Sequence, residues 1–293
     1  MNVRLLFILV CSFSLFHMAN GKQKPNSKFA GVQVGTITYS FRSMPDQSLD
    51  AILNYCVSSG INSIELMGKV VEEYLGIPPV KDSEKIKEWR LSVTLERFIE
   101  IRKMFSNRGV NIHILKLGNP KWSDEELDYA FQACKALGAK GISMEISEVA
   151  AKRMAPFAEK HKLFVVFHNH LQPGNPDFSF DKILSYGSYL RLNFDVGHYY
   201  GATSKHPNEL IERLHDRIVS IHIKDKTGKN DPDPNKNQSF GKGTTPLGDI
   251  LHLIQKNKWP INCDIELEYQ IPEGSNAVKE VARCVDYCRS LLK

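Results

Sequence analysis

Several features that would direct a functional assignment are missing from this chain of 293 residues. The formal net charge is +5, but the sequence has no block of like charge and no basic patch interleaved with aromatic residues, which argues against nucleic acid as a partner. A Gly-x-Gly-x-x-Gly turn follows none of the apolar runs, and Gly241-Lys242-Gly243 lies in a long polar stretch. A dinucleotide-binding fingerprint is therefore not expected.

A disulfide framework is also missing. The sequence has six cysteines, and setting aside Cys11 in the N-terminal segment leaves an odd, scattered set. We expect these residues to be buried as small apolar side chains in helices and one strand. They are Cys56, Cys134, Cys263, Cys284 and Cys288.

The N-terminus carries the one long uncharged apolar run. Arg4 precedes an apolar stretch from Leu5 to Phe16, and Ala19-Asn20-Gly21 follows it as a small-x-small site. This pattern is typical of a secretory signal, predicted over residues 1–21, and the run is too short to span a membrane. Val10 before Cys11 is too large for a lipoprotein signal. We therefore expect an exported, periplasmic protein, with a polar linker over residues 22–30.

Eight short apolar runs rich in β-branched residues recur along the rest of the chain. Amphipathic stretches of helical periodicity separate them, at the spacing of one βα unit. This alternation over residues 31–293 predicts a single-domain (β/α)₈ TIM barrel, with an open doubly wound sheet as the alternative. The predicted strands are Gly31–Ile37, Ile61–Leu66, Val110–Leu115, Gly141–Ile146, Leu163–His168, Leu190–Asp195, Ile218–Ile223 and Ile261–Leu267.

The predicted helices lie between these strands. Ser123 and Glu126 form a capping box that starts one of them, and Gly138 ends it. Residues 68–90 contain Pro78-Pro79 and many charges, and residues 226–245 are rich in Asp, Pro, Asn, Lys and Gly. We expect both to be long loops over the catalytic face, as lids or as solvated insertions. The predicted helices are Ser48–Ser59, Leu91–Arg108, 123–138, Glu148–Lys160, Asp181–Tyr186, Pro207–Leu214, Pro246–Asn257 and Ser275–Leu292.

Polar residues gather where the predicted strands end. Each alone has an ordinary structural explanation, such as a capped helix or a paired histidine. Together they place many charges inside one barrel, which is costly unless the charges are paired or bind a metal. Mixed carboxylate and imidazole ligands suit Mn²⁺, Zn²⁺, Co²⁺ or Mg²⁺, so one divalent ion is expected. The residues are Glu65, His113, Glu145, His168, His170, Asp195, His198, His222, Lys224, Asp225, Glu266 and Glu268.

Two motifs in this set carry a family resemblance. Asp195-Val196-Gly197-His198 and His222-Ile223-Lys224-Asp225, followed by Glu266, resemble the xylose isomerase-like TIM-barrel family. That family, related to the AP endonuclease family 2 enzymes, includes sugar isomerases, epimerases and inosose dehydratases. The resemblance extends from about Gly31 to Leu292, and the segment after Glu266 resembles an exported bacterial subgroup described as sugar phosphate isomerase/epimerase-like.

The resemblance implies a metal held by Asp195, His222 and Glu266. The family's glutamate on the fifth strand is replaced here, because the chain reads His168-Asn169-His170. The fourth ligand is therefore expected to be His168, with Glu145 as the alternative. Glu268 takes the place of Glu266 if the register of the eighth strand differs by two.

The implied reaction is proton abstraction beside a sugar carbonyl, as in a sugar isomerase or epimerase. The acid, base and ligand groups would be Glu145, His168, Glu266 and Glu268. Alternatives are a lyase or dehydratase on a keto-sugar or keto-glycoside, and a non-catalytic sugar-binding barrel. A repair nuclease is disfavoured because the Asp-x-His expected after Asp225 is missing.

The oligomeric state stays open. Predicted contacts to the carbohydrate substrate are Glu65, His113, His170, His198, Lys224 and Asp225.

Overall fold

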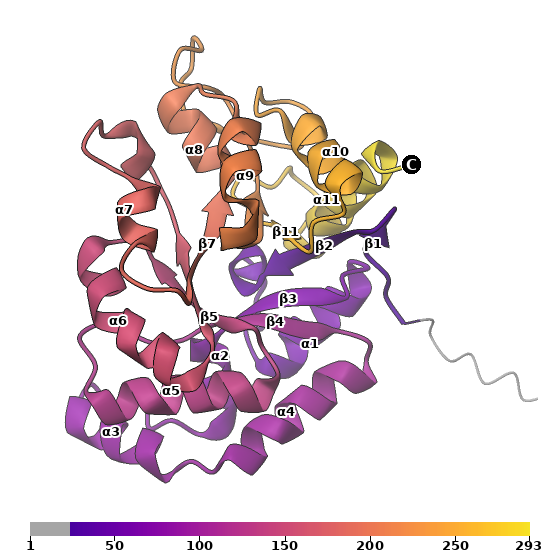
Figure 1. The fold of residues 1–293 in the computed structure, drawn as a ribbon. Coiled ribbons are helices and arrows are strands. Elements are labelled where there is room, and N and C mark those ends of the chain that lie inside the picture. The colour runs from indigo at the N-terminus through magenta and orange to yellow at the C-terminus, as the bar shows by residue number, and fades with distance from the viewer. Residues whose placement is uncertain (1–23) are drawn as a thin grey trace, which may run out of the picture.

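The computed structural model describes residues 24–293, which fold as a (β/α)₈ barrel (Figure 1). Eight parallel strands follow one another around the barrel, and it closes where β2 pairs with both β11 and β3. The eight strands are β2 (Val32–Ile37), β3 (Ser63–Met67), β4 (Asn111–Lys116), β5 (Gly141–Glu145), β6 (Phe164–His168), β7 (Leu190–Asp195), β8 (Ile218–Ile223) and β11 (Asn262–Ile265). All eight predicted strands and the predicted fold are confirmed. The predicted signal, residues 1–21, lies outside the described part of the chain.

The closing seam joins the first and last barrel strands. Gly35 on β2 is in register with Asp264 on β11. A Cβ at position 35 would lie 2.1 Å from Asp264 Oδ1, so only glycine admits this carboxylate. Thr36 Oγ1 and Ser40 Oγ both donate hydrogen bonds to the Ile265 carbonyl, at 2.9 and 3.0 Å. The short strand β1 (Lys28–Phe29) adds to β2 in antiparallel orientation.

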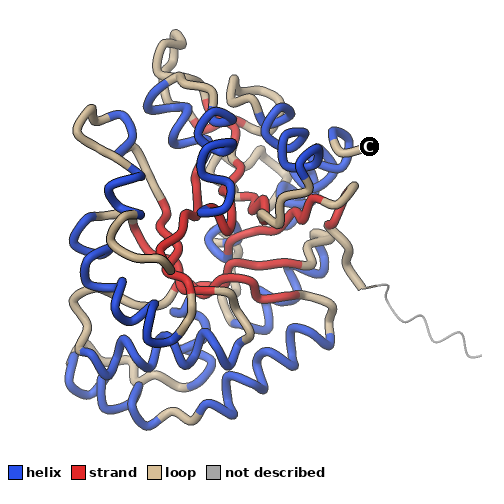
Figure 2. The backbone as a smooth tube through the Cα atoms, in the orientation of Figure 1, coloured by secondary structure: helices blue, strands red, loops and turns tan. Residues whose placement is uncertain are grey.

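Helices surround the strands (Figure 2). The predicted capping box is confirmed, since the Ser123 side chain and Glu126 cap α5 reciprocally. The helices that follow the predictions are α1 (Leu49–Ser58), α4 (Leu95–Asn107), α5 (Asp124–Leu137), α6 (Glu148–His161), α7 (Phe180–Leu184), α9 (Pro207–Leu214), α10 (Leu247–Asn257) and α11 (Ala277–Leu291).

Three α-helices within residues 24–293 were not predicted. Residues 68–90, expected to be a loop, hold α2 (Gly68–Leu75) and most of α3 (Ser83–Ser92), and α4 begins after α3 instead of continuing it. Within the described chain, no residue of α3 is buried, so the apolar periodicity that reveals a helix is weak there. The third is α8 (Val196–Thr203), which starts directly at the end of β7 because Asp195 caps it.

The second predicted loop, residues 226–245, contains a small hairpin. Its strands are β9 (Asp225–Lys226) and β10 (Asn237–Gln238), which pair antiparallel. The Asp225 carboxylate accepts hydrogen bonds from the amides of Gly241 and Gly243 at 2.8 and 3.0 Å. This carboxylate therefore ties the far end of the loop to the end of β8.

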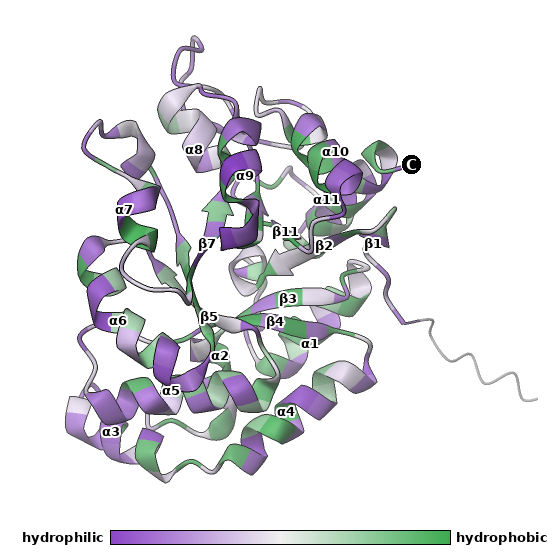
Figure 3. Cartoon of the chain, in the orientation of Figure 1, coloured by the Kyte–Doolittle hydropathy of each residue, from purple (hydrophilic) through white to green (hydrophobic). Residues whose placement is uncertain are grey.

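The apolar core lies mainly between the strands and the helices. Hydrophobic and hydrophilic stretches alternate along the helices in Figure 3, as expected for elements with one buried face. Cys56, Cys134, Cys263, Cys284 and Cys288 are buried and free, as the sequence predicts. Among residues 24–293, no helix combines the length and the apolar character needed to cross a membrane.

Candidate metal and substrate site

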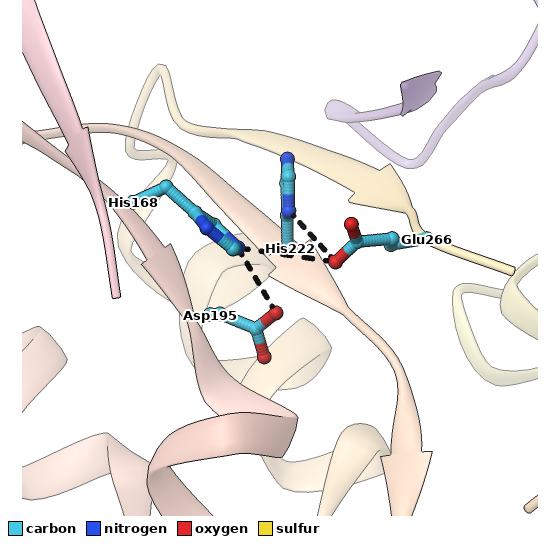
Figure 4. A group of neighbouring side chains, drawn as sticks. All are labelled: His168, Asp195, His222 and Glu266. Atoms are coloured by element: carbon cyan, nitrogen blue, oxygen red, sulfur yellow. Dashed lines mark hydrogen bonds and ion pairs between the residues drawn. The ribbon is translucent and has the colours of Figure 1, made fainter. Parts of the chain in front are cut away.

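Four of the predicted residues meet at the C-terminal end of the barrel (Figure 4). His168, Asp195 and His222 come from β6, β7 and β8, and Glu266 directly follows β11. All four are buried, and one ligand atom from each lies within 4.8 Å of the others. His168 Nε2 is 3.3 Å from Asp195 Oδ2, and His222 Nδ1 is 3.1 Å from Glu266 Oε2.

His222 is oriented from below by Glu65. Its Nε2 lies 2.7 Å from Glu65 Oε2, which also accepts a hydrogen bond from Asn193 Nδ2 at 2.7 Å. Burial raises the pKa of Glu65. The charge and the hydrogen bond of His222 lower it by more, so the pKa is about 2. An ionised Glu65 keeps a proton on Nε2, so Nδ1 is the nitrogen that faces the cluster and is available to a metal ion once its own proton is lost.

Asp195 is fixed by its role as a helix cap. Its Oδ1 accepts from the His198 amide at 2.7 Å, and its backbone pairs with the side-chain amide of Asn169 at 3.0 and 3.1 Å. Oδ2 is left to face His168 and Lys224. The capping geometry thus determines which carboxylate oxygen enters the cluster.

Lys224 supplies a cation beside these groups. Its Nζ lies 2.6 Å from Glu268 Oε2, 2.7 Å from Glu266 Oε2 and 3.1 Å from Asp195 Oδ2. Burial lowers the pKa of Lys224, but the surrounding carboxylates raise it above its usual value. One ammonium group leaves part of the carboxylate charge uncompensated.

The donor set fits a divalent cation. Burial lowers the pKa values of His168 and His222, and neighbouring carboxylates raise them more, so both imidazoles tend to hold a second proton in the absence of metal. A metal ion would replace those protons, because it binds the neutral imidazole and the ionised carboxylate. Two nitrogen and two oxygen donors are a typical set for Zn²⁺ and Mn²⁺.

The rim of the site is formed by Glu145, His170 and Lys116. Glu145 Oε1 accepts from Lys116 Nζ at 2.9 Å, and Oε2 lies 2.9 Å from His170 Nε2 and 3.4 Å from His168 Nδ1. Burial raises the pKa of Glu145, but hydrogen bonds from the two histidines and the charge of Lys116 lower it well below its usual range. Glu145 is half exposed and ionised.

Lys116 was not predicted. It is the last residue of the otherwise largely apolar strand β4, and a lone lysine at a strand end has no motif to mark it.

His198 lies between Lys224 and His170. Its Nε2 is 3.0 Å from Lys224 Nζ, and its ring stacks on His170 with centroids 4.8 Å apart. Burial lowers the pKa of His198 to about 4, with the charges of Lys224 and Lys226 adding to the effect. The ring is therefore neutral at physiological pH, and within the described chain its buried Nδ1 has no hydrogen-bond partner.

Three predicted substrate contacts lie elsewhere. His113 is deep in the barrel, where Nε2 lies 2.8 Å from Asp264 Oδ2 and Nδ1 lies 3.0 Å from Ser63 Oγ. Glu65 is fully buried beneath His222, and Asp225 anchors the loop after β8. The sequence grouped these three residues with the others at the strand ends, and the structure places them apart from the four-residue cluster, since period-two alternation gives the face of a strand but not the depth along it.

A parallel barrel with histidine and carboxylate side chains at the C-terminal strand ends defines the class of protein. The chain belongs to the xylose isomerase-like TIM barrel family, whose pattern it matches over residues 53–288. No curated protein matches the chain.

Solved structures share the fold at low identity. A sugar phosphate isomerase/epimerase from Parabacteroides distasonis is 17% identical, with a TM-score of 0.63 over 92% of this chain and 100% of that one. The probable 3-DHS dehydratase AsbF from Bacillus anthracis is 13% identical, with a TM-score of 0.63 over 87% of this chain and 98% of that one. The IOLI protein, solved with a zinc atom, is 15% identical, with a TM-score of 0.60 over 89% of this chain and 99% of that one.

Proposed function

We propose that this protein is a divalent-metal-dependent isomerase or epimerase that acts on a sugar or keto-sugar by removing a proton beside a carbonyl. The observation that carries the proposal is the convergence of His168, Asp195, His222 and Glu266 within 4.8 Å at the catalytic end of the barrel. The sugar phosphate isomerase/epimerase and the zinc-containing IOLI protein among the structural neighbours support it.

In this proposal His168, Asp195, His222 and Glu266 hold the metal ion. Bound there, the ion would supply positive charge that polarises the carbonyl and hydroxyl oxygens of the sugar. Glu65 keeps His222 in the tautomer that can bind, and Asn169 holds the backbone of Asp195 in place.

Two carboxylates remain for acid–base chemistry. Glu145 lies on the His168 side of the cluster and Glu268 on the Lys224 side. An epimerase needs one group to remove the proton and a second to return it from the other face of the carbon. We assign these roles to Glu145 and Glu268, with the stacked rings of His170 and His198 and the Lys224 ammonium binding substrate oxygens.

A lyase or dehydratase is the second candidate. It is favoured by His168, which stands where the family's strand-five carboxylate is expected, because elimination requires only one strong base. The probable 3-DHS dehydratase among the structural neighbours supports the same alternative. The two outcomes differ in product, since only elimination releases water or an alcohol.

Metal content of the purified protein tests the ligand assignment. The wild type is expected to bind about one Mn²⁺ or Zn²⁺ per chain, as four converging donors imply. Asp195→Ala and His222→Ala should lose this metal, whereas Asp286→Ala, at an exposed surface position, should keep it. Equal metal in all four proteins, or none in the wild type, would overturn the assignment and favour a sugar-binding barrel.

The reaction is tested with the metal-loaded wild type. Candidate sugars and keto-sugars are incubated in deuterium oxide, and the carbon beside the carbonyl is monitored by NMR. Deuterium incorporation at this carbon, without loss of water or an alcohol from the sugar, supports isomerisation or epimerisation. Release of water or an alcohol supports the lyase instead, and absence of exchange in every sugar contradicts both.

A further inference from the structure

A cavity adjoins the rim formed by Glu145, His170 and Lys116. Its volume is about 460 Å³, and it lies between the α2–α3 segment and the chain that connects β4 to α5. The lining is largely apolar and includes Ile77, Pro78, Val80, Leu117 and Trp122. This volume lies within the range of pockets that bind small molecules.

Lys116 links this cavity to the catalytic site. Its side chain lines the cavity, and its Nζ donates to Glu145 Oε1 at 2.9 Å. Glu145 in turn contacts His168 and His170. A ligand bound at the metal cluster and extended past Glu145 therefore enters this cavity.

Close backbone packing shapes the inner wall. Gly68 starts α2 directly against Leu117, since a Cβ at position 68 would lie 2.5 Å from Leu117 Cδ1. Gly118 turns the chain after β4 with a φ of +120°, a conformation that other residues rarely adopt. Both glycines allow the α2–α3 segment to sit beside the end of β4.

Arg90 fixes the outer wall. Its guanidinium bonds Glu72 on α2 at 2.7 and 3.1 Å and Glu126 on α5 at 2.9 Å, and lies 3.7 Å from the centroid of the Trp122 ring. Arg90 and Trp122 together line a separate cavity on the outer side. The Trp122 indole therefore has Arg90 on one face and borders the cavity of about 460 Å³, where it can contact a ligand.

The apolar lining is unusual for its position. Part of it comes from the segment that joins α2 to α3, where Val80 is 40% exposed and Pro79 beside it is exposed as well. An apolar surface next to an indole, at the edge of a catalytic site, is typical of a place that binds a ring with an apolar face.

We infer that this cavity is a subsite for a ring-bearing aglycone, so that the substrate is a glycoside and not a free monosaccharide. The inference rests on the proposed function only in placing the sugar itself at the metal cluster. An aromatic group and a second pyranose ring both present an apolar ring face, so either kind of aglycone could occupy the cavity. Charged side chains line part of the cavity, but its apolar side, where the Trp122 indole lies with Ile77, Val80 and Leu117, favours the aromatic group.

Isothermal titration calorimetry with Mn²⁺ present tests the subsite. The ligands are methyl and phenyl β-D-glucopyranosides, galactopyranosides and xylopyranosides, with cellobiose as the second-pyranose arm. In the wild type the phenyl glycoside of at least one pair should bind about tenfold more tightly than its methyl partner, because the ring is buried. Tighter binding of cellobiose than of the phenyl glucoside would assign the subsite to a sugar.

Two matched variants locate the effect. Val80→Asp puts a charge into the cavity, and Ile99→Asp makes the same change on α4 at a residue of almost equal exposure, 40% against 39%. Val80→Asp should reduce the phenyl-to-methyl ratio to about one with the methyl affinity unchanged, while Ile99→Asp keeps the wild-type ratio. Equal affinities within every wild-type pair, including no measurable binding, would overturn the subsite, as would a ratio that Val80→Asp leaves intact.

The subsite and the proposed reaction fail separately. A phenyl-to-methyl affinity ratio well above one, without proton exchange in any sugar, supports the subsite and contradicts the reaction. Exchange in a free sugar together with a ratio of one supports the reaction and removes the subsite.

Discussion

The barrel interior holds imidazole–carboxylate contacts at two depths, and their surroundings differ. In the lower contact, His113 and Asp264 are almost fully buried and take their other hydrogen bonds from Ser63 and Ser220. In the upper cluster, the partners of the carboxylates are His168, His222 and the Lys224 ammonium, and the half-exposed Glu145 opens it to the surface.

This difference separates a packing role from a binding role. The lower contact is enclosed by strands and bonded to neutral hydroxyl groups, so it fills and orders the barrel. The upper cluster concentrates carboxylates that one lysine cannot balance, so it is suited to bind a cation. Asn193 connects the two levels, accepting from Ser220 Oγ at 2.6 Å and donating to Glu65.

Glu266→Gln in the upper cluster should cause the largest loss of turnover. It keeps the size of the side chain and removes a carboxylate that faces His222 and Lys224. We expect kcat/KM to fall about 10³-fold or more, with the fold retained. Steady-state kinetics and circular dichroism check this, with the exposed Glu273→Gln as control. Near-normal turnover would contradict the division between the two levels.

Asp264→Ala should act on stability instead. It leaves His113 without its buried partner, which costs about 3 kcal/mol in the free energy of unfolding, whereas Ser220 keeps Asn193 as an acceptor. Metal binding at the upper cluster should persist. Urea unfolding and elemental analysis measure the two quantities, with Asp286→Ala as the exposed match. Loss of metal without loss of stability would reverse the roles assigned to the two levels.

Glu65→Gln probes the connection between the levels. Without the carboxylate, His222 loses the partner that favours the proton on Nε2. Metal affinity should fall about 10- to 100-fold, as is typical when the carboxylate behind a histidine ligand is removed. A competition assay with a metal chelator measures it, and Glu73→Gln at the surface is the control. Unchanged affinity would show that packing alone orients His222.

The apolar layer outside the strands should be the least reactive region. Burial raises the pKa of Cys134 and of Cys284 to about 12, so the reactive thiolate forms only above that pH. Iodoacetamide labelling of the native protein should therefore stay low from pH 7 to pH 9, where an ordinary thiol with a pKa near 8.5 becomes reactive. Mass spectrometry of native and urea-unfolded protein measures it. Rising native labelling would show that this layer opens.

The strands were predictable because burial on both faces requires continuous apolar runs, such as the one that ends at His168. The convergence of His168, Asp195, His222 and Glu266 was predictable because parallel strands bring their C-terminal ends together. The depth of His113 was not predictable, since the sequence shows which face a residue occupies and not how far along the barrel it lies.

The helix α3 and the residue Lys116 were missed for related reasons. The α3 helix is held by the charges of Arg90 and Lys87 and by the partly buried Trp89, without a fully buried apolar face within the described chain, so its sequence resembles a solvated loop. Lys116 acquires its role only through Glu145, which is distant in sequence. Contacts of this kind become visible only when the strands are assembled.

The seam between β2 and β11 also bears on how the barrel forms. Its hydrogen bonds join residues 225 to 229 positions apart, as in the pairs Ser40–Ile265 and Thr36–Ile265. Contacts of such long sequence separation form late, because the chain between them must be ordered first. During synthesis, β2 can pair with β3 early, but nearly the whole chain must emerge before its second partner, β11, is available. Glu266 follows directly after this last strand, so the cluster of His168, Asp195, His222 and Glu266 is completed only when β11 joins the barrel.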